Sequence, residues 1–113
     1  MISKGAKQLL EIVEELFPNQ RIELEHNVAP RGGLFLDIYL PRLKIAFEFD
    51  GLQHFQYTEH FHGTRQDFVK AKKRDIQKED LCREQNITLI RVAYNEELTK
   101  ELVQNKIMEV LGG

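Results

Sequence analysis

The order of two hydrophobic periods along the chain predicts its secondary structure. Near the N-terminus, Leu9, Val13 and Leu16 share one face at helical spacing, Ser3 is a suitable N-cap, and Pro18 lies just past the end. Between residues 20 and 49 apolar and polar positions alternate, as they do in half-buried strands. The predicted elements, in chain order, are a helix over residues 3–17, strands over 20–28, 34–40 and 44–49, a helix over 66–84, a strand over 87–93 and a helix that starts at Asn95 or Thr99.

The connections between these elements predict an α/β fold. Pro41 leaves a short link between the second and third strands, which favours an antiparallel hairpin. Residues 30–33 have the composition of a turn, and residues 55–64 have no clean period and are predicted to be a loop over the strand ends. This order of helices and strands is typical of a mixed four-stranded sheet with helices packed against it. In the long charged helix, which Asn86 is expected to end, the candidate inward positions are Phe68, Ala71, Ile76 and Leu81.

Length and composition are typical of one globular domain that covers residues 1–113. With 42% hydrophobic and 30% charged residues, the chain can bury a single core and is not disordered. Cys82 is the lone cysteine, which excludes an internal disulfide and a cysteine-based zinc cluster. No apolar run is long enough for a signal peptide or a membrane span, so we expect a cytoplasmic protein with no membrane partner.

Two carboxylates follow one another at the end of the predicted third strand. Glu48 and Asp50 alternate with apolar residues, so both point to one face of the sheet, where like charges repel. Asp37 lies in the middle of the second strand, and the hairpin can bring it beside Glu48 or Asp50. Carboxylates with retained waters are the ligands that magnesium uses, so the cluster predicts a divalent-metal or acid-base site. The alternative is that Glu48 and Asp50 are solvated residues on the open face of the sheet.

Further groups with suitable chemistry follow this strand. His54 comes where the strand ends, and its imidazole can take a proton from a water or ligate a metal. Asp75 and Lys78 lie about one turn apart on the long helix and share a face. From that face Asp75 can orient His54, while Lys78 or Arg74 holds a phosphate. The alternative for Asp75 and Lys78 is an ordinary exposed helix pair.

Four motifs occur in an order that resembles a known group of nucleases. They are Leu36-Asp37-Ile38-Tyr39-Leu40-Pro41, Glu48-Phe49-Asp50-Gly51-Leu52-Gln53-His54-Phe55, Lys73-Arg74-Asp75 with Lys78 and Cys82, and Leu89-Ile90-Arg91-Val92. The chain resembles the endonucleases related to the very-short-patch mismatch-repair nuclease. Within that group it is most similar to the nuclease domain of phage homing endonucleases with the EDxHD active-site pattern, a branch of the PD-(D/E)xK superfamily. The resemblance covers residues 34–98.

This resemblance implies a fold, an activity and a cofactor. The fold would be the restriction-endonuclease-like core. The activity would be that of a Mg²⁺-dependent endodeoxyribonuclease that hydrolyses phosphodiester bonds in double-stranded DNA, with Mn²⁺ able to substitute. Cleavage of both strands would call for a homodimer. We expect the chain to be the catalytic domain of a longer phage or bacterial protein with separate DNA-binding modules.

The resemblance also implies a role for each matching residue. Asp37 and Glu48 would hold the metal. Asp50 stands where the superfamily usually has a lysine and would supply a ligand or position a water. His54 would be the general base in place of that lysine, with Asp75 as its orienting partner. The remaining contacts would be to phosphates, through Lys78 in the active site and through the basic residues Arg65, Lys72, Lys73 and Arg74.

The EDxHD pattern also has a glutamate on the opening helix, and this chain has no glutamate at the corresponding position. Ala6 stands at that position. Either Glu11 or Glu14 supplies the carboxylate from a shifted position, or the protein lacks it, or the sequence was altered to make it inactive.

Two other functions fit parts of the sequence. One is a mismatch-type nicking endonuclease. The repair relative, however, binds a structural zinc ion with cysteine ligands, and a chain with Cys82 as its lone cysteine cannot form such a site. A catalytically silent DNA-binding module with the same fold is the other, and Ala6 favours it. His54, His60 and His62 also suggest a zinc site. His60 and His62, however, lie in a predicted loop, whereas zinc ligands are usually held by secondary structure.

Overall fold

The computed structural model describes residues 3–52 and 63–112. Their order, α-βββ-α-β-α, is the predicted one, and the boundaries lie within a few residues of the predicted ranges. The first strand is the main exception, because it begins at Glu23 rather than at residue 20. The elements are α1 (Lys4–Leu16), β1 (Glu23–Asn27), β2 (Phe35–Leu40), β3 (Ile45–Asp50), α3 (Arg65–Glu84), β4 (Thr88–Ala93) and α4 (Lys100–Leu111).

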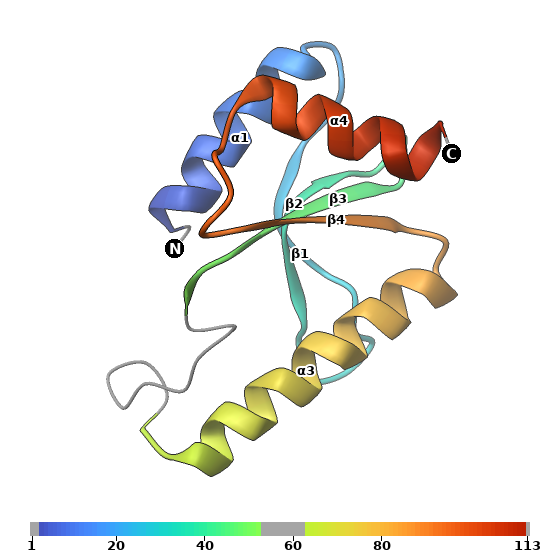
Figure 1. The fold of residues 1–113 in the computed structure, drawn as a ribbon. Helices are drawn as coiled ribbons and strands as arrows, with labels where there is room; N and C mark the ends of the chain where they lie inside the picture. Colours follow the sequence, from blue (N-terminus) through green and yellow to red (C-terminus); the bar gives the residue numbers. More distant parts are fainter. Residues whose placement is uncertain (1–2, 53–62, 113) are drawn as a thin grey trace.

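The four strands form one mixed sheet in the order β1-β2-β3-β4. β1 pairs with β2 and β2 pairs with β3 in antiparallel fashion, which confirms the predicted hairpin, whereas β4 runs parallel to β3. A parallel pair needs a crossover connection, and α3 supplies its helix. Figure 1 shows α1 and α4 on one face of the sheet and α3 on the other. The predicted α/β class with a mixed four-stranded sheet is therefore confirmed.

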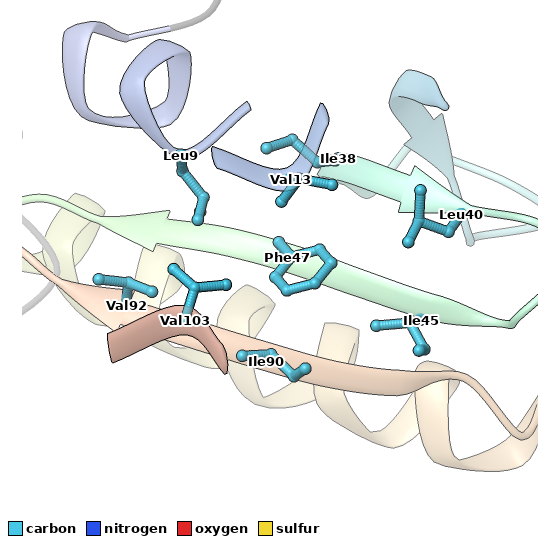
Figure 2. Packing of buried hydrophobic residues seen from close by; sticks show 9 residues of the cluster. All are labelled: Leu9, Val13, Ile38, Leu40, Ile45, Phe47, Ile90, Val92 and Val103. Carbon is cyan, nitrogen blue, oxygen red and sulfur yellow. The ribbon is translucent and has the colours of Figure 1, made fainter. Parts of the chain in front are cut away.

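The face toward α1 and α4 carries the main hydrophobic core. Phe47 lies at its centre, fully buried between the strands and the two helices (Figure 2). The ring is surrounded by side chains from β2, β3, β4, α1 and α4, namely Leu9, Val13, Ile38, Leu40, Ile45, Ile90, Val92 and Val103. Because side chains alternate along a strand, the neighbours of Phe47 in β3, Ala46 and Glu48, face α3 instead.

α3 covers the sheet with a face that is partly polar. The predicted inward position Ile76 is wrong, since this residue is 59% exposed. Cys82 is the buried residue of the helix, and Leu81 packs against the same small cluster. Asp75 and Lys78 lie half-buried on the helix, because the sheet face beneath them carries carboxylates rather than apolar side chains alone. Among the described residues, no helix is long and apolar enough to cross a membrane.

The junction between α3 and β4 has a defined C-terminal cap. Asn86 adopts a left-handed conformation, with φ of 59°. Its N–H donates to the carbonyl of Arg83, and the N–H of Ile87 donates to the carbonyl of Cys82, which is the Schellman pattern. Asparagine tolerates this conformation better than most residues. The cap places β4 directly after α3 and so determines which residues of the two elements face each other.

We expect substitutions at Asn86 to change stability according to their backbone preference. Asn86→Ala should lower the free energy of unfolding by about 1 kcal/mol, because alanine is strained in the left-handed conformation. Asn86→Gly should be at least as stable as the wild type, because glycine adopts this conformation without strain. Thermal unfolding monitored by circular dichroism measures both. Gln77→Ala, at an exposed position of α3, is the control and should be close to neutral. Equal unfolding midpoints for the alanine and glycine variants would contradict this account.

Candidate functional site

The candidate site begins where β2 and β3 stop pairing through their backbones. The ladder runs from Leu40 opposite Ile45 to Ile38 opposite Phe47. At the next position the side chains take over. The N–H of Asp37 donates to Glu48 Oε2 at 2.8 Å, and the N–H of Phe49 donates to Asp37 Oδ2 at 3.0 Å. Each carboxylate thus binds the other strand, and the hairpin brings Asp37 and Glu48 together.

Lys78 reaches this pair of carboxylates from α3. Its Nζ lies 2.6 Å from Glu48 Oε1, and the two side chains are 14% and 4% exposed. Both oxygens of Glu48 are therefore engaged, one by the Asp37 amide and one by an ammonium. A buried carboxylate would be costly without such partners. The structure places the predicted phosphate contact Lys78 directly on a predicted metal ligand.

A second ion pair occupies the same face of the sheet one strand further along. Arg91 of β4 donates through Nη1 to Asp50 Oδ1 at 2.9 Å and through Nε to Glu79 Oε1 at 3.1 Å. Burial acts to lower the pKa of the Arg91 guanidinium, but the carboxylates of Asp50, Glu48, Asp75 and Glu79 outweigh it and raise that pKa above its ordinary value. Arg91 thus stays charged.

Sequence reasoning assigned no role to Arg91. A signal was present, since Arg91 is a lone charge between the apolar residues Ile90 and Val92. Such a charge in a strand that belongs to a covered parallel pair needs a partner on the sheet. The pairing of β3 with β4 supplies it, because Arg91 lies opposite Glu48 in the register and two positions from Asp50 along β3.

Asp50, the third acid that the sequence placed on this sheet face, has its side chain held by Arg91. Within residues 3–52 and 63–112, no group of three or more His, Cys, Asp or Glu side chains is placed to hold a metal ion. The carboxylates that do approach each other are those of Asp37 and Glu48.

The protonation of Asp37 reflects this crowding. Burial and the neighbouring charge of Glu48 together raise the pKa of the Asp37 carboxyl to about 7, while the Phe49 amide and the Lys78 ammonium act in the opposite direction. The Asp37 carboxyl is therefore difficult to ionise beside Glu48, even though the Lys78 ammonium lies nearby.

Of the remaining predicted site residues, Asp75 is described by the structure and the histidines are not. Asp75 lies half-buried on α3, close enough to affect the charge of Arg91. His54, and with it the proposed contact to Asp75, lies outside the described residues, as do His60 and His62. The zinc hypothesis, which depends on these histidines, therefore stays a hypothesis.

The opening helix bears on the unmatched acid. Ala6 is 1% exposed and lies on the buried side of α1 with Leu9 and Val13. Glu11 and Glu14 are exposed. Neither glutamate is on the side of the helix that faces the sheet, so the structure offers no support for a shifted carboxylate from either.

The predicted DNA-binding residues all lie on the N-terminal half of α3. Arg65, Lys73 and Arg74 are exposed, and Lys72 is half-buried. A groove of about 430 Å³ runs along this part of the helix and is lined by Arg65, Gln66, Val69, Lys70 and Lys73. Three of these five residues are cationic, so the helix presents a basic surface beyond the end that packs on the sheet.

Comparison with known proteins finds viral relatives. No family model matches the chain. It is 35% identical over 74 residues to the uncharacterised protein 307L of Invertebrate iridescent virus 6, which is 66% of the chain and 38% of that protein. It is 45% identical over 62 residues to the uncharacterised protein 094L of Frog virus 3, which is 54% of the chain and 40% of that protein. A third match, 28% identical over 83 residues, is the uncharacterised protein 033L of Invertebrate iridescent virus 3.

These matches change the biological setting that the resemblance suggested. The relatives belong to iridoviruses, whereas the sequence led us to expect a phage or bacterial protein. The chain spans about two fifths of the length of the curated relatives it matches.

The raised pKa of Asp37 predicts how stability depends on pH. In the folded protein the pKa of Asp37 is about 7, which lies above its ordinary value of 3.8. The protonated carboxyl therefore contributes to the stability of the fold fully below pH 3.8, and this contribution is lost as the pH rises through 7. Asp37→Asn keeps an acceptor for the Phe49 amide but cannot ionise. At pH 8 in the absence of divalent cations it should raise the unfolding midpoint by about 4 °C or more, with little gain at pH 4.

Differential scanning calorimetry at the two pH values measures this difference. Asp80→Asn, which removes an exposed carboxylate from the same helix as Lys78, is the control and should shift the midpoint little at either pH. A gain for Asp37→Asn that is the same at pH 4 and pH 8 would show that charge repulsion at this site is not its cause.

Proposed function

We propose that the chain is a Mg²⁺-dependent endonuclease domain that hydrolyses phosphodiester bonds in double-stranded DNA, with a restriction-endonuclease-like core. The observation that carries this proposal is the pair formed by Asp37 and Glu48 where β2 and β3 separate. A half-buried and a buried carboxylate that each bind the opposite strand, with a lysine on one of them, are the arrangement expected of a site for a hard cation and a phosphate. The motif resemblance supports the same activity.

The residues present fit a magnesium ion. One or two carboxylates, with waters and substrate oxygens completing the shell, are sufficient for this metal. Asp37 and Glu48 supply the two carboxylates, and the reluctance of Asp37 to ionise beside Glu48 is relieved by added positive charge. When bound, the metal would polarise the scissile phosphate and favour hydroxide as the nucleophile.

The other residues of the site would act on the DNA phosphate and on protons. Lys78 and Arg91 place two cations on the sheet face that carries Glu48, where they can stabilise charge that develops on phosphate oxygens. We propose His54 as the general base, with Asp75 on α3 as its orienting partner. Asp50 is proposed to hold Arg91 in position rather than to bind the metal directly.

The basic half of α3 is proposed as the surface that carries the DNA backbone to the site. Lys73, Arg74 and Lys78 lie on one helix, so a duplex held by the first two would pass near the carboxylate pair. Phosphate contacts of this kind give affinity without sequence specificity. Sequence recognition would then depend on other parts of a longer protein, and double-strand cleavage on a second copy.

A catalytically silent DNA-binding module is the second candidate, and a specific observation favours it. Position 6, where the family pattern has a glutamate, is a buried alanine, and Glu11 and Glu14 are exposed on the same helix. A site with one acid fewer would retain the fold and the basic surface. Measurement of cleavage separates the two candidates.

We expect the purified protein to cleave supercoiled plasmid DNA in the presence of Mg²⁺ or Mn²⁺ and not in the presence of EDTA. Asp37→Ala and Glu48→Gln should each reduce the cleavage rate by about two orders of magnitude or more, because each removes several kcal/mol of transition-state stabilisation. His54→Ala should also reduce it strongly. Gel electrophoresis of time courses measures nicked and linear products.

The control for this experiment is Asp80→Asn, an exposed carboxylate of α3 that is paired with Arg83 and should leave cleavage unchanged. Undiminished cleavage by Asp37→Ala would overturn the assignment of the site. DNA binding with no cleavage in either metal would favour the silent module.

The basic surface predicts the salt dependence of DNA binding. A triple variant, Lys72→Ala with Lys73→Ala and Arg74→Ala, should bind duplex DNA more weakly, and the slope of log K against log salt should fall by roughly one for each lost phosphate contact. Fluorescence anisotropy over a salt series measures the slope. The control, Lys4→Ala with Lys7→Ala, removes two positive charges from α1 at the other face of the sheet and should keep the wild-type slope.

A further inference from the structure

Lys78 has two features that its proposed role as a phosphate contact does not explain. Its ammonium lies 2.6 Å from Glu48 Oε1, inside the carboxylate pair rather than on the helix surface. The side chain is 14% exposed, whereas neighbouring lysines of α3 such as Lys70 and Lys73 are exposed. Lys78 therefore contacts a residue that is proposed to bind metal.

The charge balance of the site explains this position. Arg91, the other half-buried cation on this face, is already shared between Asp50 and Glu79. Lys78 is thus the described cation that contacts Glu48, and it also acts to lower the pKa of Asp37. Without an ammonium here, two carboxylates in contact would lose their compensating charge.

We propose that Lys78 is the resident counter-ion of the carboxylate pair and competes with the divalent cation for Glu48, so that Lys78 sets how tightly the site binds metal. The inference rests on the proposed function. A dication beside Glu48 would stand within a few ångström of the ammonium, and like charges at that distance repel strongly in a partly buried site. The flexible four-carbon stem of lysine lets the ammonium leave Glu48 while the backbone stays in α3.

Two substitutions at Lys78 should move metal affinity in opposite directions. Lys78→Met keeps most of the apolar stem but removes the charge, so Mn²⁺ should bind about tenfold more tightly or better. Lys78→Arg keeps the charge and offers a planar group that can hold a carboxylate with two hydrogen bonds, so Mn²⁺ should bind more weakly than in the wild type. This opposition separates competition from a structural role, in which both variants would lose affinity.

The experiment is a titration of the whole chain with Mn²⁺ by isothermal calorimetry, without DNA, together with the unfolding midpoint with and without Mn²⁺. Lys78→Met should be less stable than the wild type without metal and should gain more from Mn²⁺, since a tighter ligand shifts the midpoint further. Lys7→Met, which removes an exposed charge from α1, is the control and should keep the wild-type affinity.

The outcomes separate this inference from the proposed function. Tighter binding by Lys78→Met, or by the neutral Lys78→Gln if the methionine variant does not fold, supports the counter-ion role. Unchanged or weaker binding by a folded Lys78→Met overturns it, while the proposed metal site stands. Absence of Mn²⁺ binding in the wild type and in every variant overturns both.

Discussion

The structure depends on how two carboxylates are accommodated between two strands. Asp37 and Glu48 each accept a hydrogen bond from the opposite strand at the point where the backbone ladder between β2 and β3 ends. Two acids in this position keep the strands connected but introduce charge into a sheet that is covered on both faces. The neighbouring elements carry cations because a buried carboxylate without compensation is costly.

This constraint explains the unusual character of α3. A helix that covers a sheet normally buries an apolar stripe. Here the half-buried positions include Asp75 and Lys78, and Cys82 near the C-terminal end is the buried apolar contact. The helix is anchored at that end by its cap at Asn86, and its N-terminal half is free to present basic side chains. One helix thus serves packing, charge compensation and the basic surface in different segments.

The two faces of the sheet divide stability from chemistry. The face beneath α1 and α4 is apolar and surrounds Phe47, and it carries no ionisable group in the core cluster that is described. The face beneath α3 holds the carboxylates, Lys78 and Arg91. Where the resemblance expects a lysine on the third strand, this protein has Asp50, and its cations come from α3 and β4 instead. A large apolar core on one face can offset the cost of the charged groups held on the other.

The sequence by itself determined the order of the elements, the hairpin, and that Asp37 meets an acid of the third strand, either Glu48 or Asp50. Hydrophobic period and turn residues act locally, and one short turn joins these two strands. It did not determine which cation would meet which acid. Lys78 and Arg91 are distant from Glu48 and Asp50 in the chain, and the crossover of α3 and the parallel register of β3 with β4 bring them together. The same long-range packing decided that Ile76 is exposed, since the inward side of α3 had to match charges on the sheet that helical periodicity cannot reveal.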